Sequence, residues 1–72
     1  MKLKELLKFL PHEAEVTFEI VEETYPIGIL AKNILLIYPR AAEYEVTLID
    51  AGISTCEGKD IPTLCIEVSN GN

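Results

Sequence analysis

The chain has 72 residues and a formal net charge of −6 at pH 7, from twelve acidic and six basic side chains. A hydrophobic content of 49% is enough for a packed core and argues against intrinsic disorder. The length predicts one domain with a thin core. The negative charge argues against direct nucleic-acid binding, since neutralising phosphates requires a basic surface.

The sequence has no apolar run near the ~20 residues of a membrane-spanning helix. Its first residues alternate lysine with leucine, unlike the apolar stretch of a secretory signal. We therefore expect no membrane association and a cytoplasmic location. In that setting Cys56 and Cys65 are expected to be free thiols, whereas an oxidising compartment would allow them to bridge neighbouring strands.

The first element is predicted to be a helix over residues 2–10. Apolar side chains recur there with the spacing of one helical face, at Leu3, Leu6, Leu7 and Leu10. Pro11 ends this pattern, because it has no N–H and disfavours helical geometry in the residue before it. The spacing then changes to two, which predicts a half-buried strand over 14–22.

A second strand is predicted over 27–30, starting after Pro26. The segment that follows has two interpretations: one long strand over 27–38, or a turn at 31–33 and a further strand over 34–38. Asn33 favours the turn, because asparagine tolerates left-handed backbone geometry. The uninterrupted apolar run from Ile34 to Ile37 indicates a strand that is covered on both faces or lies in an interface.

The second half of the chain predicts strands over 43–49 and 62–68. Gly52 indicates a bulge or turn at 50–52, and 57–60 has the composition of a hairpin loop. Residues 69–72 are expected to form a frayed tail. The fold class is therefore α+β, with one N-terminal helix packed on an antiparallel sheet of four or five short strands, connected as a meander.

The junction between the helix and the first strand carries a resemblance. The stretch from Lys4 to Val16, KELLKFLPHEAEV, resembles the KELL-x-x-LP-x-x-AEV opening of small proteins encoded by bacteriophages and mobile elements. A Tyr-Pro-Ile like that at 25–27 starts the next strand in those proteins. The resemblance covers the first half of the chain. It implies a helix-plus-sheet domain in a phage or mobile-element setting, and it carries no catalytic residues.

No group of residues in the sequence suggests a reaction. A zinc site needs about four ligands, and two cysteines with one distant histidine, His12, do not supply them. A cysteine nucleophile would need that histidine beside it. Gly58-Lys59 lacks the glycine-rich turn of a phosphate-binding loop. We therefore expect no enzyme, no metal and no cofactor.

Strand alternation predicts that one sheet face packs under the helix and that the other is acidic. The side chains expected under the helix are Val16, Phe18, Ile20, Tyr44, Val46, Leu48, Leu64 and Ile66. Those expected on the acidic, partner-binding face are Glu15, Glu19, Glu43, Glu45 and Glu67. Excess apolar surface predicts self-association through Ile27, Ile29, Ile34, Leu35, Leu36, Ile37 and Tyr38.

The leading functional hypothesis is a protein-binding module of phage or mobile-element origin. Its acidic face would bind the basic surface of a host defence protein in a bacterial cell, as an inhibitor of a CRISPR effector would. One alternative is a homo-oligomeric assembly protein whose acids only maintain solubility. A remote alternative is a small-ligand sensor at an oligomer interface.

Overall fold

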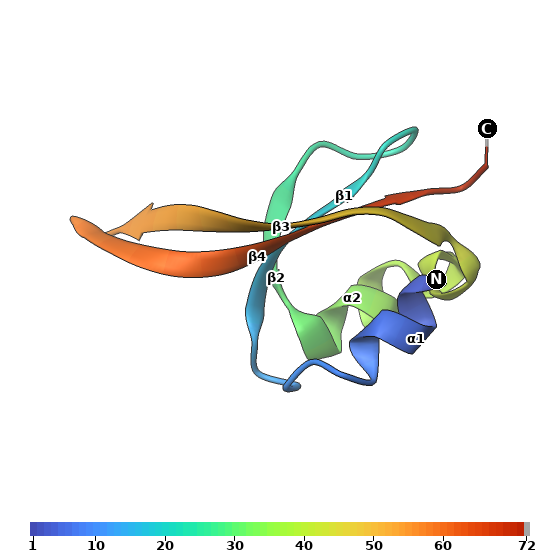
Figure 1. The fold of residues 1–72 in the computed structure, drawn as a ribbon, viewed down its shortest axis with the longest axis horizontal. Coiled ribbons are helices and arrows are strands. Elements are labelled where there is room, and N and C mark those ends of the chain that lie inside the picture. Colours follow the sequence, from blue (N-terminus) through green and yellow to red (C-terminus); the bar gives the residue numbers. More distant parts are fainter. Residues whose placement is uncertain (72) are drawn as a thin grey trace.

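The computed structural model describes residues 1–71, apart from the side chains of Ser54 and Cys56. The elements in chain order are α1 (Leu3–Leu7), β1 (Glu15–Ile20), β2 (Ile27–Leu30), α2 (Ala31–Ile37), the 3₁₀ helix η1 (Pro39–Glu43), β3 (Glu45–Cys56) and β4 (Lys59–Ser69). The strands form one sheet in the order β2-β1-β4-β3, and the helical segments pack on one of its faces (Figure 1). The predicted α+β class, with the N-terminal helix on the sheet, is confirmed.

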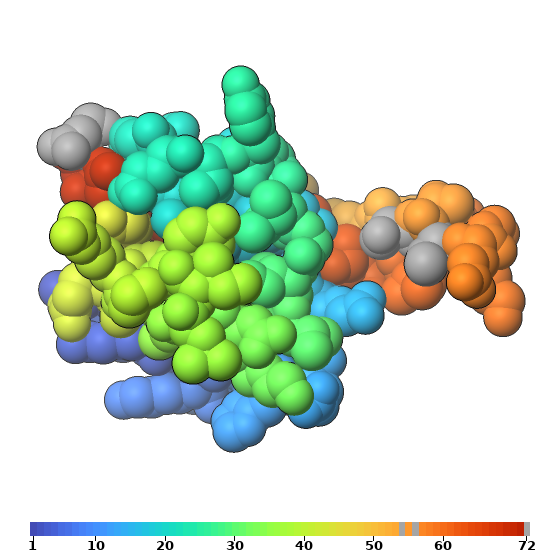
Figure 2. Space-filling view, turned by 180° about the vertical axis from the view of Figure 1, so that it is seen from behind, coloured from blue at the N-terminus to red at the C-terminus, as the bar shows by residue number. Residues whose placement is uncertain are grey.

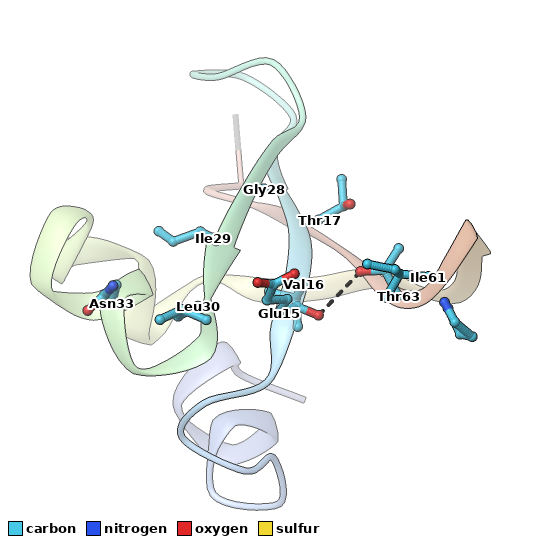
Figure 3. A pocket seen from close by; sticks show the side chains of 10 residues that line it. Glu15, Val16, Thr17, Gly28, Ile29, Leu30, Asn33, Ile61 and Thr63 are labelled. Carbon is cyan, nitrogen blue, oxygen red and sulfur yellow. Dashed lines mark hydrogen bonds between the residues drawn. The ribbon is translucent and has the colours of Figure 1, made fainter. Parts of the chain in front are cut away.

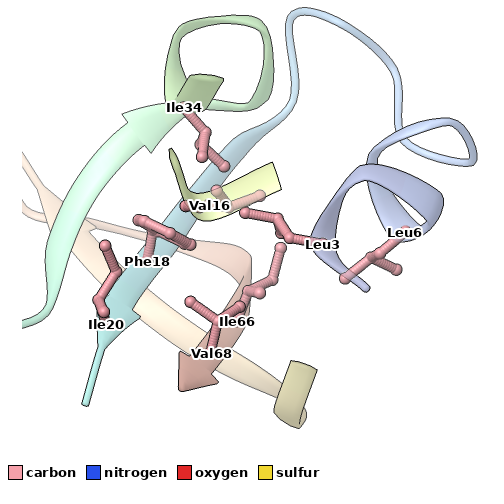
Figure 4. Packing of buried hydrophobic residues seen from close by; sticks show 9 residues of the cluster. Leu3, Leu6, Val16, Phe18, Ile20, Ile34, Ile66 and Val68 are labelled. Atoms are coloured by element: carbon pink, nitrogen blue, oxygen red, sulfur yellow. The ribbon is translucent and has the colours of Figure 1, made fainter. Parts of the chain in front are cut away.

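The core lies between this sheet face and the helical layer (Figure 4). The strands contribute Val16, Phe18, Ile20, Ile66 and Val68, and the helical segments contribute Leu3, Leu6, Ile34 and Ala41. The Phe18 ring also packs against Tyr38, with ring centroids 5.8 Å apart. Alternate positions of the two central strands thus carry the apolar face that the sequence predicts.

Helix α1 is shorter than the predicted 2–10. It begins after Lys2, whose backbone N–H donates to Glu5 Oε1 at 3.1 Å. Beyond Leu7 the chain continues in tighter turns, in which the N–H of Leu10 donates to the Leu7 carbonyl at 3.3 Å. The approach to Pro11 therefore loosens the last predicted turn of the helix.

The strand predicted over 34–38 is wrong, because this segment belongs to helix α2 (Ala31–Ile37). The apolar run from Ile34 to Ile37 is therefore not covered on both sides. Ile34 points into the core, whereas Leu36 is 78% exposed. One wall of the core is thus a helix that follows directly on β2.

The predicted meander is also wrong, since the sheet is mixed. The β1–β2 and β3–β4 pairs are antiparallel, but β1 pairs with β4 in parallel, with Phe18 beside Ile66. β2, α2, η1 and β3 all intervene between these two central strands. This crossover brings β4 back beside β1 in the same direction.

Strands β3 and β4 form a long hairpin. The bulge or turn predicted at 50–52 is absent, because β3 continues through Gly52 to Cys56 and its register shift lies earlier, between Val46 and Leu48. The chain reverses instead at Glu57 and Gly58, whose φ angles of 52° and 77° are typical of a two-residue hairpin turn. The end of this hairpin projects beyond the rest of the molecule (Figures 1 and 2).

The predicted strand 43–49 and tail 69–72 are corrected at their ends. Glu43 ends η1, and β3 begins at Glu45. Ser69 is the last residue of β4, and the N–H of Asn70 donates to Glu22 Oε1 at 3.0 Å. Ser69 and Asn70 are thus held against the β1–β2 connection, and residue 72 lies outside the described residues.

Candidate functional site

The sheet face opposite the helices is uncovered by any other element in the described part of the chain. We call this surface the open face. Strand alternation and register place on it Glu15, Thr17 and Glu19 of β1, Thr63, Cys65 and Glu67 of β4, and Leu48, Asp50 and Gly52 of β3.

The structure brings together three of the predicted acids on the open face. Glu19 and Glu67 are direct register partners on the parallel strands β1 and β4, and Glu15 lies on the same side of β1. Asp50, which the sequence interpretation missed, joins them as the register partner of Cys65. Together they concentrate negative charge on one surface.

Asp50 reaches this face because of a β-bulge in β3. The register shifts between Val46 and Leu48, so the strand faces reverse from there onward. Leu48, predicted to pack under the helix, therefore lies on the open face opposite Glu67. A bulge leaves little mark in local sequence, which is why simple alternation gave the wrong face beyond Val46.

Glu43 does not lie on the open face, so its predicted place among the acids of that face is wrong. It ends η1, where its two carboxylate oxygens accept hydrogen bonds from Lys2 Nζ at 2.9 Å and Lys4 Nζ at 2.7 Å. These lysines lower the pKa of Glu43 from 4.5 to about 2. Glu43 joins α1 to η1 as part of the helical layer.

Glu45 lies at the margin of the open face, where β3 begins. It pairs with Ser69 in the sheet, and one carboxylate oxygen is 3.1 Å from the amino group of Met1. Its charge is therefore compensated within the chain. The acids of the open face that form no ion pair among residues 1–71 are Glu15, Glu19, Asp50 and Glu67.

The basic side chains are segregated from these acids. Five of the six belong to the helical layer, namely Lys2, Lys4, Lys8, Lys32 and Arg40, and Lys59 lies at the hairpin turn. Two of the helical lysines bind Glu43, and Lys32 binds Glu13 at 2.7 Å. None of the ion pairs found among residues 1–71 involves Glu15, Glu19, Asp50 or Glu67.

A shallow groove of about 280 Å³ runs across the open face. It is lined by Thr17, Glu19, Pro26, Leu48, Cys65, Ile66 and Glu67. The Thr47 hydroxyl donates to Glu67 Oε2 at 2.6 Å and fixes this carboxylate beside the groove. The groove thus combines apolar walls with two carboxylates, a lining suited to the aliphatic stem and charged end of a lysine or arginine.

The residues predicted for self-association are divided among several environments. Ile34 is buried, and Ile27, Ile29, Leu35 and Tyr38 are half-buried. Only Leu36 and Ile37 are exposed, on the outer side of α2. Most of this apolar segment packs within the chain, and the surface that remains for association is small.

A second groove, of about 480 Å³, lies where β1 and β2 meet the hairpin (Figure 3). The Thr63 hydroxyl donates to the Glu15 carbonyl at 3.2 Å on its floor. Glu15 is the one titratable group in its lining. The groove therefore has neither a nucleophile with its base nor a pair of carboxylates.

Other reactive groups are widely distributed. His12 lines a groove between α1 and α2, on the helical side of the sheet. The free thiol Cys65 lies on the opposite, open face; the Cys56 side chain lies outside the described residues. No three histidine, cysteine or acidic side chains gather to hold a metal ion within the described structure.

Within residues 1–71, no helix is long and apolar enough to cross a membrane. Comparisons with protein-family models, with curated proteins and with solved structures give no match for this chain. Functional inference therefore depends on the surfaces described above.

Proposed function

We propose that this chain is a small, non-enzymatic protein-binding module, which docks its open face on a basic surface of a partner protein. The observation that carries this function is the register of Glu19 and Glu67, two acidic residues directly opposite each other on neighbouring strands. Like charges directly opposite each other destabilise a sheet. A basic partner would remove this repulsion and fill the groove between them.

The separation of charge supports the same function. An acidic face backed by a basic helical layer orients the molecule as it approaches a positive surface, and so raises the association rate. A protein that binds nucleic acid presents such a surface in its own binding groove. The resemblance of residues 4–16 to phage and mobile-element proteins favours a host defence protein, such as a CRISPR effector, as the partner.

The experiment compares two variants that change net charge equally, from −6 to −3 by neutralising three acids. The face variant carries Glu15→Gln, Glu19→Gln and Glu67→Gln. The control variant carries Glu13→Gln, Glu23→Gln and Glu57→Gln, which lie outside the open face. Parent and variants are immobilised, and the bacterial proteins that each retains are identified and purified.

The expected result is a protein that binds the parent and the control variant but not the face variant. Duplex DNA or RNA should displace the chain from it. Its affinity for the parent should fall between 0.05 and 0.5 M salt, because added salt shortens the ~10 Å screening length found at 0.1 M. Equal retention by the two variants, or binding that salt and nucleic acid leave unchanged, would contradict the proposed function.

A further inference from the structure

A groove with apolar walls lies between α1 and α2, on the side of the sheet opposite the open face. Its volume is about 270 Å³, and we call it the helical groove. Leu7, Leu10 and Leu35 pack against the core from one side only, and each of these side chains is half-buried. The full lining consists of Leu7, Leu10, His12, Ala31, Lys32 and Leu35.

The apolar surface continues beyond the helical groove along α2. Leu36 follows Lys32 by one helical turn, so the two side chains project from the same side of this helix. Leu36 is 78% exposed. A large exposed apolar side chain next to a groove walled by leucines is typical of an interaction surface.

The rim of the helical groove is basic. Lys32 belongs to its lining, and Lys8 directly follows Leu7 at the end of α1. Lys8 takes part in none of the ion pairs found among residues 1–71. Lys32 pairs with Glu13, but these side chains are 45% and 73% exposed, and so exposed a pair contributes little to stability. The carboxylate of a partner can therefore replace Glu13.

Shape and charge together select the occupant of the helical groove. Two neighbouring helices present a groove into which the side chains of a third helix pack, with apolar anchors spaced three and four residues apart. The helices of a second copy carry lysines at the same positions and would be repelled. An anionic bilayer would be repelled by the net charge of −6. A helix with an apolar stripe flanked by carboxylates meets both requirements.

We propose that the helical groove binds an acidic amphipathic helix of another protein. The apolar side chains of this helix enter between Leu10 and Leu35 and cover Leu36, and its carboxylates bind Lys8 and Lys32. Because the helical groove and the open face lie on opposite sides of the sheet, the chain can hold an acidic helix and a basic protein at the same time. The proposed helix site does not depend on the function of the open face.

A synthetic peptide tests the site. The probe is a helix of about five turns made of leucine, glutamate and alanine, with its leucines on one face. A scrambled peptide of the same composition distributes the leucines around the helix. Fluorescence anisotropy measures binding at 0.1 M salt, where the ~10 Å screening length limits repulsion by acids across the sheet. The parent should bind the amphipathic peptide at least tenfold more tightly, and equal affinities or no binding would overturn the proposal.

Paired substitutions locate the peptide on the chain. The groove variant, Lys32→Gln with Leu36→Ser, should weaken peptide binding about tenfold. The matched control is Lys59→Gln with Ile53→Ser, which removes one lysine and one exposed apolar side chain from the hairpin and should leave the affinity unchanged. All four side chains are exposed, so both variants should fold. An equal loss of affinity in the two variants would overturn the site.

Glu13→Gln tests the site by a gain of binding. This change releases Lys32 from its ion pair and should strengthen peptide binding about two- to fivefold. Glu57→Gln, in the hairpin turn, changes the net charge equally and should leave peptide binding unchanged. The same effect in both variants would contradict a role for Lys32.

Further measurements separate this site from the open face and from other occupants. The face variant should bind the amphipathic peptide at least as tightly as the parent, and the groove variant should bind oligolysine as the parent does. Phosphatidylglycerol vesicles and sedimentation of the parent alone test a bilayer and a second copy. Vesicle binding or dimerisation that the groove variant abolishes would overturn an acidic helix as the occupant.

Discussion

Glu19 and Glu67 lie side by side on the parallel strands β1 and β4, on the face of the sheet opposite the helices. The Thr47 hydroxyl holds one of these carboxylates, and no basic side chain forms an ion pair with either one within residues 1–71. The chain therefore places two acidic residues in direct register on its two central strands. Like charges in register destabilise a sheet, and under the proposed function this pair is the determinant that binds a basic partner.

Neutralising one member of this pair should stabilise the free chain. We expect Glu19→Gln to raise the free energy of unfolding by about 0.2–1 kcal/mol at low salt, and by less at 0.5 M salt, because salt already screens the repulsion. Urea unfolding at both salt concentrations measures this difference. Glu57→Gln in the hairpin turn is the control. A destabilised Glu19→Gln chain would contradict the repulsion inferred here.

Among residues of the helical layer, substitution of Leu3 should lower the free energy of unfolding most. This side chain is completely buried between α1 and the sheet, so Leu3→Ala leaves a cavity and should cost about 2–5 kcal/mol. Leu36→Ala, at an exposed position on α2, should change stability by no more than about 0.5 kcal/mol. Thermal and urea unfolding compare the two variants, and equal losses would show that α1 is not packed as described.

Acid should destabilise the chain partly through Glu43. Its pKa is lowered from 4.5 to about 2 by Lys2 and Lys4. A carboxyl with a lower pKa in the folded state stabilises the fold above its unfolded pKa, and this contribution is lost as pH falls from 4.5 towards 2. Hydrogen bonds from Ser69 and Asn70 also lower the pKa of Glu22, which adds to the same dependence.

Melting temperatures between pH 6 and pH 2 test this assignment. The parent should lose stability on acidification, and Glu43→Gln should lose less across the same interval. Glu57→Gln should retain the parental slope. An unchanged slope in Glu43→Gln would show that the two lysine contacts do not stabilise the folded chain.

A glycine should be needed at position 52, because a larger side chain there would collide with Cys65 on β4. A Cβ at this position would lie 2.8 Å from Cys65 Sγ, so Gly52→Ala forces the thiol to move and should cost about 1 kcal/mol. In a Cys65→Ala background the contact is absent, and Gly52→Ala should become neutral or stabilising because alanine restricts the unfolded chain. A double-mutant cycle in urea measures this coupling, and strictly additive effects would contradict it.

Local patterns in the sequence were sufficient for β1, β2, the start of α1 and the chain reversal near 57–60, but not for the length of β3, which was predicted to end at 49. They misled at Ile34–Ile37, where four consecutive apolar residues resemble a buried strand. The helical spacing is nevertheless visible when the residues on both sides of the run are included, at Ala31, Ile34, Leu35 and Tyr38. These are the apolar positions of α2 and its C-cap that are buried or half-buried.

The open face was predictable only in part, for a physical reason. Alternation within β1 and β4 places Glu15, Glu19 and Glu67 correctly, because each strand is regular. The parallel pairing that sets Glu19 beside Glu67 depends on contacts between distant segments. The bulge after Val46 reverses the rest of β3, so one irregular residue decides where Leu48 and Asp50 point.

The most direct test of the open face is a nuclear magnetic resonance titration of the isotope-labelled chain with an oligolysine peptide at low salt. We expect the largest amide shift changes in β1 and β4, around Thr17, Glu19, Cys65 and Glu67, and their loss in the face variant but not in the control variant. Changes centred on Glu13, Glu23 or Glu57, or spread evenly over all acids, would contradict the central claim that the open face is the site that recognises a basic partner.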